Sequence, residues 1–185
     1  MKILFRAYQE VLRRHPFGVQ AIQTGLLMGA GDIIAQTAIE KKTFRELDRQ
    51  RLIGYSALGL CVLGPSLRLW YGLLDRFFPT TGKKLAYKKV LLDQLAFAPS
   101  AIAVVVSLTS AVNGSSVPQI RAKLHQDYVD ILIANYKLWP AVMVINFSLV
   151  PLQYQVLVTQ VVAVFWNTYF SWKANQPLQL PLPHS

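Results

Sequence analysis

Long stretches without a charged residue constrain this chain more than any other feature of its sequence. Four runs contain no Asp, Glu, Lys or Arg, and they are 17, 16, 27 and 35 residues long: 15–31, 52–67, 94–120 and 138–172. A helix that crosses a bilayer needs about 20 consecutive, mostly apolar residues. The runs therefore predict a helical membrane protein, and they argue against a disordered chain and against a soluble enzyme with an ordinary wet surface.

The same runs predict an all-α bundle of four membrane-spanning helices, near residues 17–39, 52–74, 90–112 and 140–170. The whole chain of 185 residues is expected to form a single membrane domain. The alternative is the buried helical core of a soluble bundle. Only 15% of the residues are charged, against about 25% in soluble domains, which argues against that alternative.

Three shorter segments lie outside the predicted spans. Residues 1–15 carry four basic residues interleaved with apolar ones at helical spacing, which predicts an interfacial or a targeting helix. Residues 113–118 have the composition of a loop. Residues 120–138 have one apolar face, which predicts an amphipathic helix that lies on the membrane and leads into the fourth span.

The charge balance indicates a membrane rather than a nucleic-acid partner. The chain has 19 Lys and Arg against 9 Asp and Glu, but the basic residues occur in short runs between apolar stretches. No cluster on one groove-reading face is evident, so direct nucleic-acid binding is not expected. Four spans would put both termini on the same side of the membrane.

No motif for soluble-type catalysis occurs in the sequence. Cys61 is the only cysteine, and three histidines stand apart from any second metal ligand. Phosphate-binding, zinc-protease and nucleophile-elbow motifs are absent. The sequence predicts neither an enzyme nor a bound cofactor or metal.

Each of the first three predicted spans has a narrow face of small residues. In the first span Gly25 and Gly29 form a GxxxG pattern, which lets two helix backbones approach closely. In the second, Gly64 lies on the small face and Pro65 predicts a kink. These faces are predicted to be the packing surfaces of the bundle.

The small faces also carry the ionisable residues of the spans, so those charges are predicted to point into the bundle. An ionisable group at membrane depth is by default a functional candidate, with a structural ion pair as the alternative. The candidates are Asp32 with Gln36, Arg68, and Asp93 with Gln94.

Depth along straight helices predicts which of these charges meet. At 1.5 Å per residue, Arg68 and Asp93 differ in depth by about 4 Å, whereas Arg68 and Asp32 differ by about 13 Å. We therefore expect Arg68 to pair with Asp93. Asp32 is then expected to lack a basic partner and becomes the candidate for setting ion preference or gating.

The predicted fourth span carries amides instead of charges. Asn146, Gln153, Gln160 and Asn167 are each seven residues apart, a spacing that drifts by only about 20° per step on a helix. Such a stripe could line a solute path or join helices by hydrogen bonds, and the sequence leaves both open. Pro151 is expected to bend the helix between its first two members.

Short motifs that resemble those of one family are spread over nearly the whole chain: Gly31–Gln36, Gly64–Pro65, Trp70–Tyr71, Leu74–Asp75, Asp93–Gln94, Pro99, Trp139–Pro140, Asn146–Phe147, Val150–Pro151 and Trp166–Ser171. The sequence resembles the Mpv-seventeen / peroxisomal-membrane-protein-twenty-two family of small organelle membrane proteins. Residues 75–79 and 169–174 look closest to its founding mitochondrial member. The resemblance implies a four-span protein of the mitochondrial inner membrane, or alternatively of the peroxisomal membrane. It also implies a solute-permeable channel and a role in mitochondrial nucleotide supply and DNA maintenance.

Three functions from different classes follow from these observations. The first is a pore or channel for small solutes or ions, built from the small and amide-bearing faces. The second is a small secondary transporter, although the chain lacks the repeated halves usual in such folds. The third is a scaffold that assembles membrane proteins and conducts nothing. The expected partners are the lipid bilayer, an unidentified permeant and, as an open alternative, further copies of the chain.

Overall fold

The computed structural model describes residues 10, 14–78 and 83–179, and the side chains of 83–86, 147, 152 and 153 lie outside that description. All regular structure in these ranges is helical, so the predicted all-α class is confirmed. The predicted helix at residues 1–15 falls almost wholly outside the described residues.

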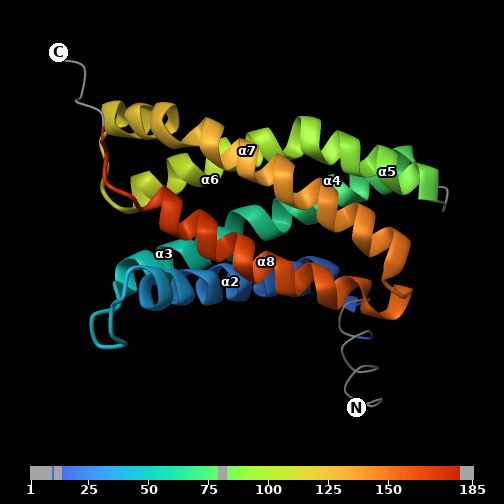
Figure 1. The fold of residues 1–185 in the computed structure, drawn as a ribbon, viewed down its shortest axis with the longest axis horizontal. Coiled ribbons are helices and arrows are strands. Elements are labelled where there is room, and N and C mark those ends of the chain that lie inside the picture. The colour runs from blue at the N-terminus through green and yellow to red at the C-terminus, as the bar shows by residue number, and fades with distance from the viewer. Residues whose placement is uncertain (1–9, 11–13, 79–82, 180–185) are drawn as a thin grey trace.

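The described helices form five long rods that lie side by side (Figure 1). Each rod runs opposite to the one before it along the chain. The rods are α2 (Pro16–Ile34) with η1 (Ala35–Ile39); α3 (Arg49–Leu58), η2 (Gly59–Leu63) and α4 (Gly64–Phe77); α5 (Lys83–Leu92), η3 (Asp93–Phe97) and α6 (Ala98–Val112); α7 (Val117–Leu149); and α8 (Leu152–Ala174).

Each of the first three rods contains one wider, π-helical turn, named η1, η2 and η3. Pro65 follows η2 and Pro99 follows η3. A proline ring clashes with the carbonyl of the residue four positions earlier and offers no N–H. A wider turn just before the proline lets the rod continue through it, and such turns are frequent at functional sites. The predicted kink at Pro65 is therefore a local change of helical pitch.

The structure differs from the predicted fourth span. Its residues 140–170 form no single helix, because the chain breaks at Val150 and Pro151 and reverses direction between α7 and α8. Val150 is extended, with φ −88° and ψ 126°, the conformation favoured before proline. The predicted interfacial helix at 120–138 is likewise the first part of the 33-residue α7.

Five rods also change the expected placement of the chain ends. Pro16, where the first rod begins, and Ala174, where the last rod ends, lie at opposite ends of the bundle (Figure 1). Four spans had predicted that both ends share a side.

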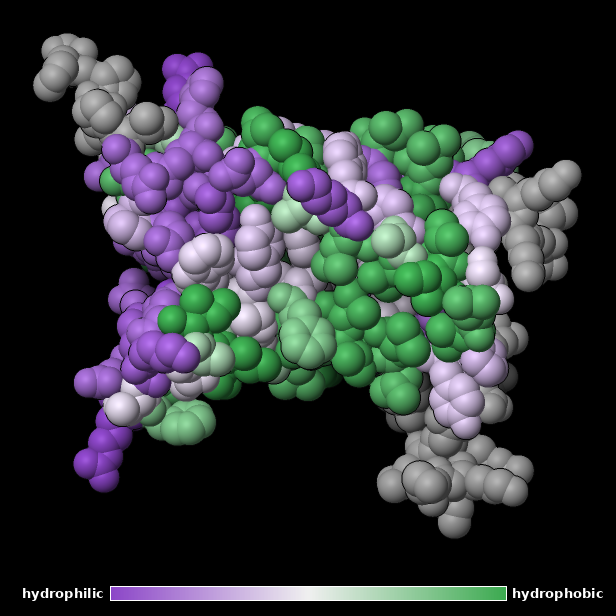
Figure 2. All heavy atoms as spheres, in the orientation of Figure 1, coloured by the Kyte–Doolittle hydropathy of each residue, from purple (hydrophilic) through white to green (hydrophobic). Residues whose placement is uncertain are grey.

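Within the described residues, three helical stretches are long and apolar enough to cross a membrane: Arg49–Phe77, Tyr87–Val112 and Val117–Asn146. Their outer faces carry large apolar side chains, among them Ile53, which is 68% exposed. Figure 2 shows hydrophobic side chains over the middle of the bundle and hydrophilic ones gathered at one end. We call that end the polar end; it holds the 40–48 connection and the 113–116 turn (Figure 1). This distribution fits a helical membrane protein.

The buried apolar core joins the rods close to the polar end. Its most buried members are Met28 of α2, Val106 of α6 and Ile131 of α7, and Tyr55 and Phe170 pack with them. Because the core draws on every rod, it fixes their relative positions.

Candidate functional site

The carboxylate of Asp32 lies at the centre of a closed ion-pair network near the polar end. Arg51 donates from Nε to Asp32 Oδ1 at 2.7 Å, and the Ser171 hydroxyl donates to the same oxygen. Gln36 donates from Nε2 to Asp32 Oδ2 at 2.8 Å. Asp32, Gln36 and Ser171 are fully buried, and Arg51 is 6% exposed. Every carboxylate oxygen thus has a donor.

The other atoms of this network tie three rods together. Arg51 Nη1 donates to Glu40 at 2.7 Å and Nη2 donates to Ser171 at 3.1 Å. The oxygen of the Gln36 amide accepts from the backbone N–H of Asp48 at 2.7 Å, and the Asp48 side chain caps the first turn of α3. Burial alone would raise the pKa of Glu40, but hydrogen bonds from Lys42 and Arg51 hold it below its ordinary value. We call these residues the Asp32 network.

The predicted pairing of charges is therefore wrong. Asp32, expected to lack a basic partner, is paired with Arg51, a residue that had been placed in the loop before the second span. Arg68, expected to pair with Asp93, instead lies over the ring of Phe17, 5.9 Å from its centroid. The prediction treated the spans as straight helices and compared only the depths of residues along them. It left out the length of the arginine side chain, which lets Arg51 extend inward from the end of its rod.

A second buried group of charges also lies at the polar end. Lys123 and Asp127 of α7 pair at 2.6 Å, with 6% and 0% of their side chains exposed. Lys173 of α8 lies 3.5 Å from Asp127 and 2.9 Å from Asp130. The sequence predicted an amphipathic helix here, with these α7 residues off its apolar face. The end of α8 instead covers Lys123 and Asp127, whereas Asp130 stays 61% exposed.

The predicted amide stripe does not form. Asn146 belongs to α7 and donates from Nδ2 to the backbone oxygen of Gln155 and to the Thr159 hydroxyl, both at 3.2 Å. It therefore joins the α7–α8 hairpin just before the break at Pro151. Gln153 has a side chain outside the described part, and only Gln160 and Asn167 face the interior space described next.

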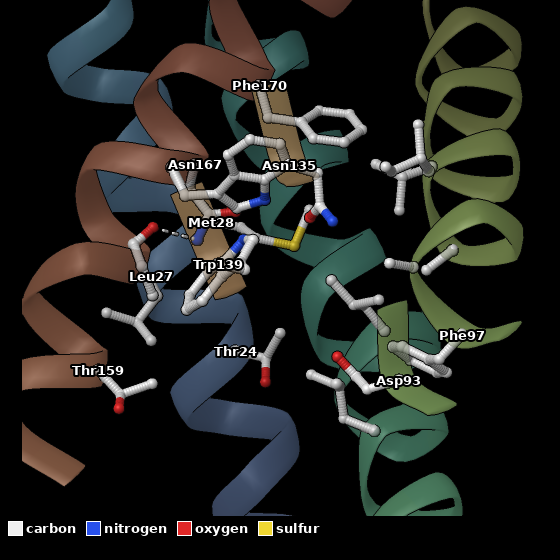
Figure 3. Close-up of a pocket in the computed structure, with 18 of the residues that line it drawn as sticks. Thr24, Leu27, Met28, Asp93, Phe97, Asn135, Trp139, Thr159, Asn167 and Phe170 are labelled. Carbon is white, nitrogen blue, oxygen red and sulfur yellow. Dashed lines mark hydrogen bonds between the residues drawn. The ribbon is translucent and has the colours of Figure 1, made fainter. Parts of the chain in front are cut away.

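A cavity of about 240 Å³ lies inside the bundle, and all five rods contribute to its lining (Figure 3). It is smaller than a typical pocket for a drug-sized ligand, about 300–1,000 Å³. Along α8 the lining runs from Thr159 to Phe170, about 16 Å or half of the hydrocarbon thickness.

Asp93 is the only charged side chain among the described residues that line this cavity. Trp70 Nε1 donates to Oδ1 at 3.1 Å, Gln94 Nε2 donates to Oδ2 at 3.1 Å, and the Tyr71 hydroxyl also bonds to it. No lysine or arginine of the described chain forms an ion pair with it. Figure 3 shows its carboxylate at the cavity, near Thr24 and Phe97.

Amide side chains extend from Asp93 along the cavity. Asn135 of α7 donates from Nδ2 to Gln94 Oε1 at 2.6 Å, so the two amides and the carboxylate form a chain. Asn167 donates to the backbone oxygen of Ala163 at 2.8 Å. Gln160 lines the cavity and makes no side-chain hydrogen bond within the described residues. Polar groups from three rods thus converge on one space.

Aromatic rings form much of the remaining wall. Trp70 stacks on Phe97 with 5.6 Å between ring centroids, which brings a ring to the wall beside Asp93. Trp166 lies edge to face with Trp139 at 6.4 Å and with Phe170 at 5.8 Å. The cavity therefore combines one carboxylate, several amides and rigid aromatic walls.

The Asp32 network begins directly beyond one end of the cavity. The lining includes Met28, Tyr55 and Phe170. Asp32 follows Met28 by one helical turn, and Arg51 precedes Tyr55 by one. Ser171 follows Phe170 immediately, so the closed network and the cavity are neighbours along three rods.

Glycines bring the rods close enough to build this arrangement. A methyl group on Gly31 would lie 2.6 Å from Asn167 Cβ of α8, and one on Gly59 would lie 2.9 Å from the Cα of Gly25. Gly29 faces Ser56, and Gly64 approaches Ala21 within 2.6 Å in the same way. The small faces identified in the sequence lie where the backbones approach most closely.

Sequence reasoning missed three contributors to the site. Asn135 was hidden in a segment interpreted as interfacial. Arg51 lies one residue before the predicted second span, so it was not counted among the ionisable residues of the spans. The wider turns could have been predicted from Pro65 and Pro99, because these prolines interrupt apolar runs. Among the described residues, no group of three or more His, Cys, Asp or Glu side chains could hold a metal ion.

The apolar rods, buried charges and internal cavity define a multi-pass helical membrane protein. A sequence profile of the Mpv17 / PMP22 family matches residues 110–171. The chain belongs to this family, because several curated relatives match nearly its full length. Mitochondrial inner membrane protein Mpv17 of Homo sapiens is 49% identical over 173 residues, which cover 94% of this chain and 98% of the relative. The Xenopus laevis protein of the same name is 47% identical with the same coverage.

A more distant relative is PXMP2/4 family protein 2 of Dictyostelium discoideum, 34% identical over 92% of this chain and 91% of the relative. No solved structure matches the chain. The relatives named as mitochondrial inner membrane proteins, together with the apolar helices, confirm the expected location in that membrane as a multi-pass protein.

Proposed function

We propose that the protein is a channel for small solutes or ions in the mitochondrial inner membrane. The observation that carries this proposal is the cavity, where polar groups of Asp93, Gln94 and Asn135 meet inside the bundle. Polar groups at membrane depth are costly and occur mainly where they serve a permeant or a packing contact. Several of these groups face open space, which favours the permeant.

All five rods cross the membrane in this proposal, so the two chain ends lie on opposite sides. The Asp32 network then closes the cavity toward the polar end, and the structure represents a closed state. The nucleotide homeostasis and mitochondrial DNA maintenance implied by the family resemblance would then be indirect consequences of solute movement through this path. A non-conducting scaffold and a secondary transporter are the competing functions.

Reconstitution separates these functions. Purified protein in a planar lipid bilayer should carry ionic current if it is a channel. Saturable exchange of a labelled nucleotide in liposomes, without such current, would favour the transporter. Neither current nor flux from correctly inserted protein would favour the scaffold.

Two substitutions of alanine by phenylalanine test whether any current passes through the cavity. Ala101 lines the cavity, whereas Ala96, on the same rod, is exposed on the outer surface. Ala101→Phe should fill part of the cavity and reduce the current. Ala96→Phe adds the same ring outside the cavity and should leave the current unchanged. Equal currents from both variants would place the path elsewhere.

A further inference from the structure

The charge and wall chemistry of the cavity define what it can hold. Its one charged lining residue is a carboxylate, and no lysine, arginine or histidine of the described chain joins it in the lining. A single negative charge in a site of low dielectric attracts cations and repels anions. The hydrogen bonds to Asp93 come from Trp70, Gln94 and Tyr71, neutral groups that leave its charge uncompensated.

The aromatic residues add a second preference for positive charge. Phe97 lines the cavity beside Asp93, and Tyr71 lines it while bonded to the carboxylate. Ring faces attract cations, most strongly where water is excluded. Such walls suit an organic cation with apolar substituents better than a small metal ion, which needs several oxygen ligands.

We propose that the cavity binds a small organic monocation, such as a quaternary ammonium or a protonated amine, with its charge at Asp93. The volume of about 240 Å³ limits the occupant to a small molecule. The amides of Asn167 and Gln160 line the same cavity and can bond to a polar substituent on the ligand. This inference deepens the proposed function, since it assigns a charge class to the solute.

Equilibrium binding to the full-length protein in detergent tests the site without requiring transport. The probe is choline, and its neutral carbon isostere 3,3-dimethyl-1-butanol has the same shape without the charge. Adenosine monophosphate serves as the anionic comparison. Choline should bind at least about tenfold more tightly than the isostere, because only choline pairs with Asp93.

Two variants in the cavity and one on the surface show whether choline binding depends on the cavity residues. Asp93→Asn keeps the shape of the side chain and should weaken choline binding at least about tenfold. Asp75→Asn removes the same charge from a side chain that is 69% exposed, and should change binding less than about twofold. Phe97→Leu should weaken choline binding while sparing the isostere, because it removes the ring face but keeps an apolar side chain.

The outcomes separate this inference from the channel proposal. Equal binding of choline and the isostere, or full choline binding by Asp93→Asn, would overturn the cation site. Adenosine monophosphate binding more tightly than choline would overturn it too. Asp93-dependent choline binding without any current in bilayers would keep the site and remove the channel. If Asp93→Asn fails to fold, choline and its isostere are compared on the unmodified protein and on Phe97→Leu. That comparison still decides whether the cavity is a cation site.

Discussion

Asp32 and Asp93 are both carboxylates on small-residue faces, yet their surroundings are opposite. Asp32 has an arginine, a serine and an amide within hydrogen-bond distance, and no part of its side chain is exposed. Asp93 has only neutral donors and lies at a cavity. The role of each carboxylate therefore depends on the side chains around it. The Asp32 network joins three rods, whereas Asp93 lines the cavity that we propose binds a solute.

Removing Arg51 should have the largest effect on the fold. Arg51→Ala leaves Asp32 and Glu40 buried or half-buried without their shared cation, which we expect to cost about 3–5 kcal/mol of stability. Thermal unfolding in detergent would measure this loss. Arg51→Lys should rescue it only in part, because lysine cannot reproduce three directed contacts to Asp32, Glu40 and Ser171.

A second substitution, added to Arg51→Ala, shows which carboxylate pairs with Arg51. Adding Asp32→Asn to Arg51→Ala should recover part of the lost stability, since it removes the unpaired charge. Adding Asp93→Asn should recover none. Recovery by Asp93→Asn alone would mean that the assignment of partners is reversed.

Gly31 tests the close approach that supports the same network. In Gly31→Ala, the new methyl group would lie 2.6 Å from Asn167 Cβ and 2.8 Å from the Asn167 carbonyl carbon. Backbone must move to accommodate it, at an expected cost of about 1–3 kcal/mol in unfolding experiments. Gly18→Ala is the matched control on the same helix, because a methyl group there meets nothing within 4 Å. Alanine favours a helix more than glycine does, so equal gains in stability from both substitutions would show that helix propensity, not packing, decides.

Two amides that the sequence treated as equivalent should now behave differently. Asn146→Leu removes the bonds across the α7–α8 hairpin and should lower thermal stability in detergent by about 0.6 kcal/mol. Gln160→Leu removes a cavity amide without a described hydrogen bond, so it should lower the current and leave stability nearly unchanged. Stability loss in Gln160→Leu with unchanged current would assign Gln160 to packing instead.

Glu40 should make a small contribution to the pH dependence of stability at acidic pH. Its folded-state pKa lies below the ordinary value of 4.5, so the carboxylate stabilises the fold above that value. The contribution is lost as pH falls from about 4.5 through the lower folded-state pKa. Glu40→Gln should flatten this part of a stability–pH curve measured by thermal unfolding. An unchanged curve would mean that Glu40 contributes nothing measurable.

The sequence predicts the general character of this fold well because its signals are local. Uncharged runs indicate apolar helices, and Gly25 and Gly29 indicate a close helix contact, each from spacing alone. The fourth span illustrates the limit of that approach. Residues 140–170 would extend about 46 Å as one helix, more than the roughly 30 Å of hydrocarbon, and Pro151 offered the place to break it.

The candidate site depends on information that spacing does not contain. Arg51 reaches Asp32 because the chain turns after η1 and brings the start of α3 alongside it. Asn135 reaches Gln94 because α7 enters the bundle instead of lying on the membrane. Asp93 and Gln94 were identified from the sequence as candidates, but their cavity exists only through the packing of five rods.

Cysteine accessibility tests directly whether one carboxylate position is open and the other closed. In a Cys61→Ser background, the folded Asp93→Cys and Asp32→Cys variants would each be treated with a water-soluble, positively charged methanethiosulfonate reagent. Ser171→Cys serves as a milder probe of the Asp32 network. We expect modification at position 93 and protection at positions 32 and 171 until the protein is unfolded. Modification at 32 and 171 with protection at 93 would contradict it.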